Sequence, residues 1–360
     1  MDNGRGDVVP DRLLVDLDAD GRVSVSTSLD GEFSATPAGE PFELVWPLDS
    51  DALEDLRWYL EDYLGAPFGV YEQRGPQVAD RLTGWGQAVF AALFGTGPAR
   101  DAYVKARAGR DVEIVFRSSV PARLGLPWEL LCDPARPTPV PLDRVAMSRS
   151  LLETNAARSF AVGGERLRVL MVISRPRGAD DVGYRMVARP LLERLEAVRG
   201  TVELVVLRPP TLERLAEELA AAQAAGEPFQ IVHFDGHGVL ADRRVAPGSG
   251  PPLTFEDSAA QGVLVFEKPG GGADPVAAAE VARVLAGAAV PVVVLNACQS
   301  GAVGKALEAA VATRLLQEGA ASVVAMAYSV YAVAAAEFMT AFYERLFAGG
   351  TRSPTRSVPG

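Results

Sequence analysis

Hydrophobic positions in the second half of the chain change their period at regular intervals. Mostly apolar runs at 167–173, 202–207 and 229–234 have the length and β-branched content of buried strands. Between them, apolar residues recur every three or four positions over 188–198 and again after Thr211, which is typical of helices with one buried face. This strand and helix order predicts a mainly parallel sheet with helices on both faces, in which functional residues gather beyond the carboxyl ends of the strands.

The same alternation continues to residue 347. Further strands are predicted at 262–266, 291–295 and 322–326, and further helices at 275–286, 305–318 and 332–347. Residues 239–261 form an unusually long connection between two predicted strands. Its length predicts either a cover over a functional site or a disordered insert.

The first part of the chain follows a different pattern, typical of a smaller α+β region. It contains a predicted hairpin (13–17 and 22–26), a helix starting near Ser50 as its N-cap, a helix at 79–94, a strand at 111–116 and one helical turn within 126–134. Small, polar and glycine-containing residues over 153–165 then predict a domain boundary. We therefore expect an N-terminal region at 1–155, an α/β domain at 156–348 and a disordered tail at 349–360, where no apolar period remains.

Charge and hydropathy exclude several classes of protein. The 360 residues carry a formal net charge of −11, so there is no surplus of basic residues for general nucleic-acid binding. No apolar run reaches the length of a membrane span, and the first residues lack the basic and apolar regions of a signal peptide. We expect a cytoplasmic protein that binds neither nucleic acid nor membrane.

The chain has only two cysteines and two histidines, and three of these four residues lie near predicted strand ends. Cys132 lies among apolar neighbours, where a small buried side chain is expected. His233 lies near the end of the strand at 229–234, His237 follows that strand, and Cys298 follows the strand at 291–295. With so few cysteines a disulfide framework is not expected, and both thiols are expected to be reduced.

A cysteine and a histidine at neighbouring strand ends suggest nucleophilic catalysis. A free thiol is mostly protonated at neutral pH, and the imidazole of His237 would supply the base that activates Cys298. The backbone amides of Gly238 and Cys298 are candidate oxyanion donors. From spacing alone, a structural interpretation with glycine turns and a buried thiol stays equally open.

Two motifs carry a resemblance to a known family. His-Phe-Asp-Gly-His-Gly at 233–238 and Leu-Asn-Ala-Cys-Gln-Ser-Gly at 295–301 resemble the signature of CHAT-family peptidases, the caspase-like and separase-like cysteine peptidases of clan CD. Residues 126–134 and 174–176 resemble flanking motifs, so the likeness covers about 110–347. It implies a caspase-like three-layer sandwich with a mainly parallel central sheet, and a cysteine endopeptidase in which His237 is the base and Cys298 the nucleophile.

The resemblance also implies partners and, more weakly, a substrate pocket. A protein or peptide substrate and a regulatory protein partner are expected, and no cofactor is required because a thiolate and an imidazole complete acyl transfer. Metacaspases, which prefer basic residues, have an aspartate where this chain has Asn296. Caspases take a pocket arginine from the loop that here holds Arg175 and Arg177. Asp235 is expected either to orient His237, to line the pocket, or to be structural.

Two other hypotheses stay open at this stage. In the first, the chain is a catalytically silent caspase-like module that binds partners and leaves the Cys/His pair idle. In the second, His233, His237 and Cys298 hold a metal ion for hydrolysis, although positions 233 and 237 of one extended strand are about 13 Å apart. A buried, hydrogen-bonded core residue is therefore the expected role of His233, and no metal site is predicted.

Overall fold

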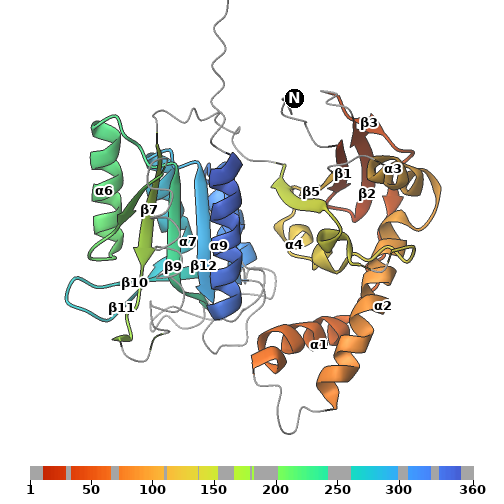
Figure 1. Cartoon of the computed structure of the whole chain (residues 1–360), viewed down its shortest axis with the longest axis horizontal. Coiled ribbons are helices and arrows are strands. Elements are labelled where there is room, and N and C mark those ends of the chain that lie inside the picture. Colours follow the sequence, from red (N-terminus) through yellow and green to blue (C-terminus); the bar gives the residue numbers. More distant parts are fainter. Residues whose placement is uncertain are drawn as a thin grey trace, which may run out of the picture. The chain divides into compact units, whose positions relative to one another are not determined.

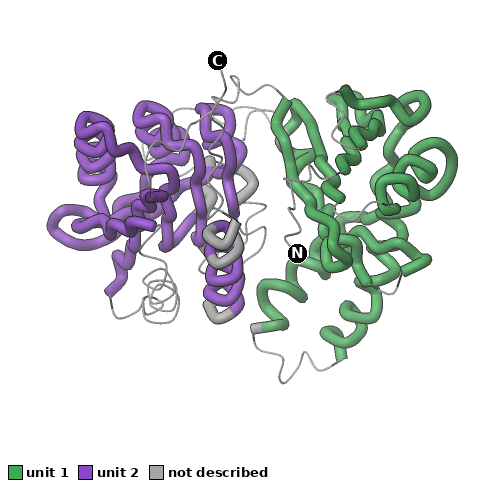
Figure 2. The backbone as a smooth tube through the Cα atoms, turned by 45° about the horizontal axis from the view of Figure 1, so that its top comes forward, with its two compact units in different colours: residues 1–153 green, residues 154–360 purple. Residues whose placement is uncertain are grey.

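The chain divides into two compact units, Met1–Glu153 and Thr154–Gly360, which Figure 2 shows in different colours. The division falls at the start of the small, polar segment 153–165. The computed structural model describes residues 11–29, 34–65, 73–108, 112–136, 138–152, 166–178, 181, 202–241, 261–298, 307–325 and 332–349. Each unit is described by itself.

The first unit combines one mixed sheet with helices (Figure 1). Its strands are β1 (Asp11–Leu17), β2 (Arg22–Ser28), β3 (Thr36–Pro37), β4 (Phe42–Glu43), β5 (Val112–Ser118) and β6 (Val145–Leu151). Its helices are α1 (Ser50–Glu61), α2 (Arg74–Phe94), α3 (Gly97–Arg107) and α4 (Pro121–Leu124), with 3₁₀ turns η1 (Tyr63–Gly65), η3 (Trp128–Leu130) and η4 (Val140–Leu142).

The strand order in this sheet is β3-β2-β1-β5-β6, with β4 also paired to β2. Strands β1 and β2 are antiparallel, which confirms the predicted hairpin, while β5 lies parallel to both β1 and β6. Helix α1 is capped by Asp49, whose carboxylate accepts from the Ala52 amide at 2.8 Å, and not by Ser50 as expected. Helix α3 and strand β6 were not predicted, because neither has a clear period of apolar residues.

The motif at 126–134 belongs to the core of this unit. Trp128 is fully buried in η3 and stacks on Phe116 of β5, with ring centroids 4.3 Å apart. Gly86 of α2 lets this turn approach closely, since a Cβ there would lie 2.1 Å from the Leu130 carbonyl oxygen. The predicted helical turn is thus a 3₁₀ turn with a packing role.

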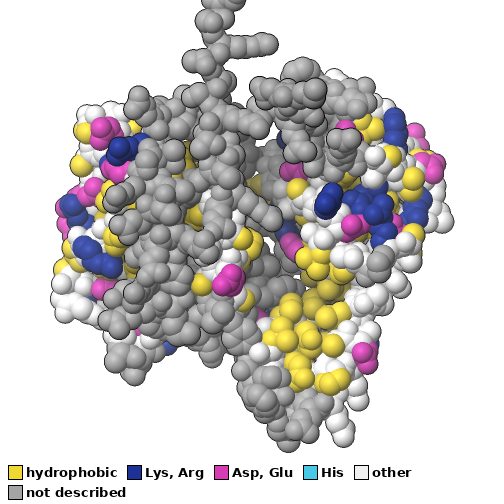
Figure 3. All heavy atoms as spheres, in the orientation of Figure 1, with side chains coloured by type: hydrophobic (Ala, Val, Ile, Leu, Met, Phe, Trp, Pro, Cys, Tyr) yellow, Lys and Arg dark blue, Asp and Glu magenta, His cyan; other side chains and the backbone are white. Residues whose placement is uncertain are grey.

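Helices α1 and α2 form a pair whose side chains are less completely buried than those around Trp128. Leu56 is the one fully buried side chain of α1, and hydrophobic side chains gather over this pair in the lower right of Figure 3. Tyr63 stacks on Tyr59 with centroids 5.4 Å apart, and the Arg74 guanidinium lies 4.1 Å from the centre of the Trp58 ring. The aromatic residues of α1 and η1 therefore pack on one another and on the first residues of α2.

The second unit contains the sheet that carries both sequence motifs. Its strands are β7 (Leu167–Ile173), β8 (Val202–Val206), β9 (Ile231–Ala241), β10 (Gln261–Glu267), β11 (Ala273–Ala277), β12 (Val292–Cys298) and β13 (Ser322–Ala325). Its helices are α6 (Leu212–Ala224), α7 (Ala278–Gly287), α8 (Leu307–Gln317) and α9 (Ala332–Gly349). Thr211 caps α6, as predicted, and its hydroxyl accepts from the Arg214 amide.

This sheet is mixed. Strand β9 is parallel to both β7 and β12, β7 is parallel to β8, and β12 is parallel to β13. Strands β10 and β11 are antiparallel to their neighbours. The alternation of strands and helices in the sequence did not predict this antiparallel pairing. A short turn joins β10 to β11, with Gly271 and Gly272 in the left-handed region, and two strands joined this tightly can only pair antiparallel.

Helices cover both faces of this sheet. Val232 and Phe234 of β9 belong to a core cluster with residues of α6, α7 and α8, including Leu219, Leu285 and Leu315. Ile231, on the opposite face of β9, packs in a second cluster with Met339 and Tyr343 of α9. The alternation along β9 therefore puts positions 231, 233, 235 and 237 on the α9 face.

His233 is a core residue, as predicted. Its side chain is completely buried on the α9 face, and its Nδ1 lies 3.0 Å from the Tyr343 hydroxyl. Desolvation lowers the pKa of His233 to about 3. The ring is thus neutral across the physiological range.

Some predicted segments lie outside the described residues. These are the helix at 188–198, residues 242–260 of the long connection and residues 350–360 of the tail. In the described part of the chain, every helix is too short or too polar to cross a bilayer.

Replacing His233 should change how stability depends on pH. Between pH 6.5 and 3 the unfolded chain binds a proton at this residue and the folded chain does not, so stability falls as the pH falls through this window. We expect His233→Gln to remove a slope of up to about 1.4 kcal/mol per pH unit. Urea unfolding followed by far-ultraviolet circular dichroism between pH 7.5 and 4.5 measures it. The same dependence of stability on pH in the two proteins would contradict a buried neutral ring at His233.

Candidate active site

The pairing of β9 with β12 brings the two predicted reactive residues side by side. The strands run parallel in a continuous register from Val292 opposite Ile231 to Cys298 opposite His237. Neighbouring strands lie about 4.8 Å apart. His237 and Cys298 are sixty-one positions apart in the sequence, but their backbones are separated by only one strand spacing.

Both residues lie inside strands and not in the loops beyond them. Cys298 is the last residue of β12, but β9 continues past His237 to Ala241. Strand β7 ends its pairing with β9 at Asp235, and β10 then takes over the same edge, with Val265 opposite His237. The expected end of this strand near residue 234 was wrong, because the antiparallel pairing that extends it was not predicted.

Glycine next to His237 serves close packing and not the sharp turn that the sequence suggested. Gly236 has no positive φ, but a Cβ there would lie 2.9 Å from the Phe234 ring and 3.3 Å from the Ser174 Cβ. Gly238 lies within β9 opposite Leu264. Its predicted role as an oxyanion donor stays a prediction.

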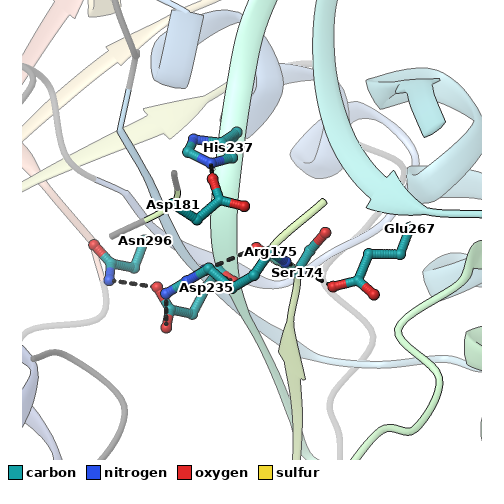
Figure 4. A network of polar contacts seen from close by, with 7 residues as sticks. All are labelled: Ser174, Arg175, Asp181, Asp235, His237, Glu267 and Asn296. Carbon is teal, nitrogen blue, oxygen red and sulfur yellow. Dashed lines mark hydrogen bonds and ion pairs between the residues drawn. The ribbon is translucent and has the colours of Figure 1, made fainter. Parts of the chain in front are cut away.

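Asp235, two residues before His237 on the same face, is the centre of a polar cluster (Figure 4). Its Oδ2 accepts from Nη2 of Arg175 at 2.7 Å, and its Oδ1 accepts from Nδ2 of Asn296 at 3.0 Å. Nη1 of Arg175 also donates to the Asp235 carbonyl oxygen at 2.8 Å. Asp235 therefore contacts both of the other residues predicted for a substrate pocket, and the role of the three toward a substrate stays a prediction.

This cluster is largely buried. The side chains of Asp235 and Arg175 are 4% and 16% exposed. Burial raises the pKa of Asp235 above its ordinary value, although the charge of Arg175 and the hydrogen bonds from Arg175 and Asn296 oppose that shift. Without Arg175 the ionised carboxylate would be a buried, poorly compensated charge.

The residue that contacts the His237 ring is Asp181, which was not among the predicted site residues. Its Oδ1 forms a short hydrogen bond with Nε2 of His237, and its Oδ2 accepts from the Arg177 amide at 2.6 Å. The two side chains are 1% and 13% exposed for Asp181 and His237. The available sequence signal was an acidic residue shortly after the β7 strand, on the edge where β9 continues.

Asp181 is held in its ionised form. Burial alone would raise its pKa, but the hydrogen bonds from His237 and from the Arg177 amide, with the charges of His237 and Arg175, bring the pKa below its ordinary value. An ionised carboxylate only accepts hydrogen bonds, so Nε2 of His237 carries the proton in this contact. In the neutral ring the lone pair then lies on Nδ1.

The described side chains contain no group of three histidine, cysteine, aspartate or glutamate residues that could hold a metal ion. Of the three residues in the metal hypothesis, His233 binds Tyr343 and His237 binds Asp181. These two rings are thus engaged with different partners.

Removing Arg175 should destabilise the second unit. Arg175→Ala leaves the Asp235 carboxylate buried with one amide donor, and breaking a buried pair in this way costs about 3 kcal/mol. We expect Asp235→Asn, added to Arg175→Ala, to recover part of the loss, because it removes the stranded charge. Arg214→Ala is the matched control, since its pairs with Glu217 and Glu218 lie on an exposed helix face and should contribute less than about 1 kcal/mol.

Denaturant unfolding of the four proteins gives these differences. Equal losses for Arg175→Ala and Arg214→Ala, or no recovery in the double variant, would contradict the structural role of the cluster.

Comparison with known proteins gives the family. The family model of the CHAT domain matches residues 86–355, which is more than half of the chain and includes β9, β12 and the segment with Asp181. A search of curated proteins found no significant match. On the family model, the chain belongs to the CHAT domain family, as its two motifs predicted.

Proposed function

We propose that this protein is a cysteine endopeptidase in which Cys298 is the nucleophile and His237 the general base. The observation that carries the proposal is the register that pairs position 298 of β12 with position 237 of β9. Paired positions on neighbouring strands share a face of the sheet, which is the relation that a thiol and its base need.

The architecture supports a caspase-like sandwich for the second unit. One face of its sheet packs against α6, α7 and α8, and the other against α9. Strands β8, β7, β9, β12 and β13 pair parallel to one another in that order. We infer a three-layer arrangement in which the antiparallel β10 and β11 extend a mainly parallel sheet.

The proposed chemistry is acyl transfer in two steps. Nδ1 of His237 takes the thiol proton of Cys298, and the thiolate attacks the peptide carbonyl carbon to form a C–S bond. The C–N bond then breaks, and the leaving amine takes the proton from His237. Water, deprotonated by His237, attacks the acyl-enzyme, the C–S bond breaks, and the proton returns to the sulfur.

The developing oxyanion needs donors. We propose the backbone amides of Gly238 and Cys298 for this role, since Gly238 directly follows the base in β9 and the other amide belongs to the nucleophile in the neighbouring strand β12. The cluster of Arg175, Asp235 and Asn296 lies one step closer to the core on the same face, so it is the proposed inner wall of the substrate pocket. Arg175 is the most exposed of the three.

The remaining elements of the proposal follow from the chemistry. The substrate is a protein or peptide, a regulatory protein is a further partner, and no cofactor is needed because the thiol and imidazole supply both proton transfer and nucleophile. A reduced thiol fits a cytoplasmic location. The acidic chain offers no basic surplus for nucleic acid.

Replacing Cys298 should abolish activity. We expect Cys298→Ala to lose both peptide hydrolysis and covalent labelling by a peptide carrying a thiol-directed electrophile, at least about 10³-fold, because no other group would form the acyl-enzyme. Cys132→Ala is the matched control. That thiol is 3% exposed, and burial, with the nearby Asp133, raises its pKa, so its removal should leave labelling unchanged.

Labelling that persists in Cys298→Ala would contradict the proposal. The catalytically silent module would instead be supported if the wild type is not labelled and if the wild type and Cys298→Ala bind a partner equally well.

A further inference from the structure

We propose that Asp181 is a positioning residue that holds His237 as the tautomer with its proton on Nε2, which leaves Nδ1 free to accept the thiol proton. The inference rests on the proposed role of His237 as the base and adds a third residue to the pair. The inference is based on the contact between Oδ1 of Asp181 and Nε2 of His237 (Figure 4). The Asp181 side chain is only 1% exposed.

The Asp181 carboxylate is fixed at both oxygens. While Oδ1 contacts the ring, Oδ2 accepts from the Arg177 amide at 2.6 Å. The turn between these residues is closed by backbone hydrogen bonds from Gly178 to Arg175 and from Asp181 to Gly178, with Gly178 at a φ of +61°. The carboxylate therefore has a defined orientation toward the ring.

The segment that holds Asp181 is attached to β9 immediately before His237. The Ser174 amide donates to the Asp235 carbonyl oxygen at 2.9 Å, and Arg175 forms the ion pair with the Asp235 side chain. The Arg175 amide also donates to Oε1 of Glu267 at the end of β10. Two strands and one loop thus fix the distance between the carboxylate and the imidazole.

Asp181, and not Asp235, is the residue suited to this role. Asp235 lies on the same face two residues before His237, but its two carboxylate oxygens bind Arg175 and Asn296. The negative charge of Asp181 also faces the ring where positive charge develops when His237 takes a proton. A buried carboxylate stabilises that imidazolium more strongly than it would in water.

Asp181→Asn tests the inference because the Arg177 amide dictates how the new side chain must lie. That amide requires an acceptor, so the Asn oxygen should face Arg177 and its NH₂ group should face Nε2 of His237. A donor at this place favours the opposite tautomer, with its proton on Nδ1. We expect kcat to fall by at least about 10²-fold, and by up to the roughly 10⁴-fold loss seen when the orienting aspartate of a serine protease triad is replaced by asparagine, with KM changed by less than about threefold.

Asp181→Ala distinguishes control of the His237 tautomer from a purely structural role of the Asp181 side chain. Alanine neither donates nor accepts at this position, so the ring is free to take either tautomer, and we expect Ala to retain at least about ten times the kcat of Asn. A purely structural role predicts that Ala is as damaging as Asn or worse, because it removes more atoms. Asp20→Asn makes the same charge change in the exposed turn between β1 and β2 of the first unit and should leave kcat within about threefold.

The ring itself gives a second measurement that does not depend on activity. Because the chain has only two histidines, ¹⁵N labelling of histidine gives two sets of ring signals, and His237→Ala identifies those of His237. With the ring neutral, we expect the Nε2–H tautomer for His237 in the wild type and the Nδ1–H tautomer in Asp181→Asn.

The outcomes distinguish the inference from the proposed function. A tautomer change in Asp181→Asn without any Cys298-dependent hydrolysis in the wild type would support the positioning role and overturn the peptidase. Cys298-dependent hydrolysis with Asp181→Asn as active as wild type, or with the Nε2–H tautomer retained, would support the peptidase and overturn the inference.

Discussion

The site depends on the register between β9 and β12. Apolar residues on both faces of these strands fix that register, because Val293 and Leu295 belong to one core cluster and Val294 to the other. A slip of one residue would exchange the two faces, moving each side chain into the wrong cluster and placing Cys298 opposite a glycine. The same burial that stabilises the sheet therefore sets the spacing between position 298 and His237.

Along the α9 face of β9, polarity increases in steps toward the site. Ile231 packs in the apolar cluster, His233 is neutral and bound to Tyr343, Asp235 is ion-paired with Arg175, and His237 is partly exposed and bound to Asp181. Each polar side chain needs a partner because burying an unpaired one is costly. The partners come from a helix, a loop and the neighbouring strand, so the polar positions connect the site to the rest of the unit.

The sequence predicted what depends on local pattern and missed what depends on distant pairing. The apolar runs of β7, β8 and β12 and the helices α6 to α9 were found from their periods, and the two motifs gave the family. The extension of β9 to Ala241 was missed because it exists only where β10 pairs with it. Asp181 was missed because its partner His237 is fifty-six residues away and its place depends on a turn with no periodic signal.

Asp181 and Asp235 have the same side chain, but their different surroundings shift their pKa values in opposite directions and give them different roles. Burial dominates at Asp235 and raises its pKa, whereas hydrogen bonds from His237 and the Arg177 amide outweigh burial at Asp181 and lower its pKa. Asp235 thus needs Arg175 to stay ionised, and that ion pair fixes the loop that carries Asp181. The sheet register sets the spacing of position 298 and His237, while this loop sets the proton position on the ring. Because the two are held by different contacts, a substitution in the loop can alter the base and leave the strand pairing intact.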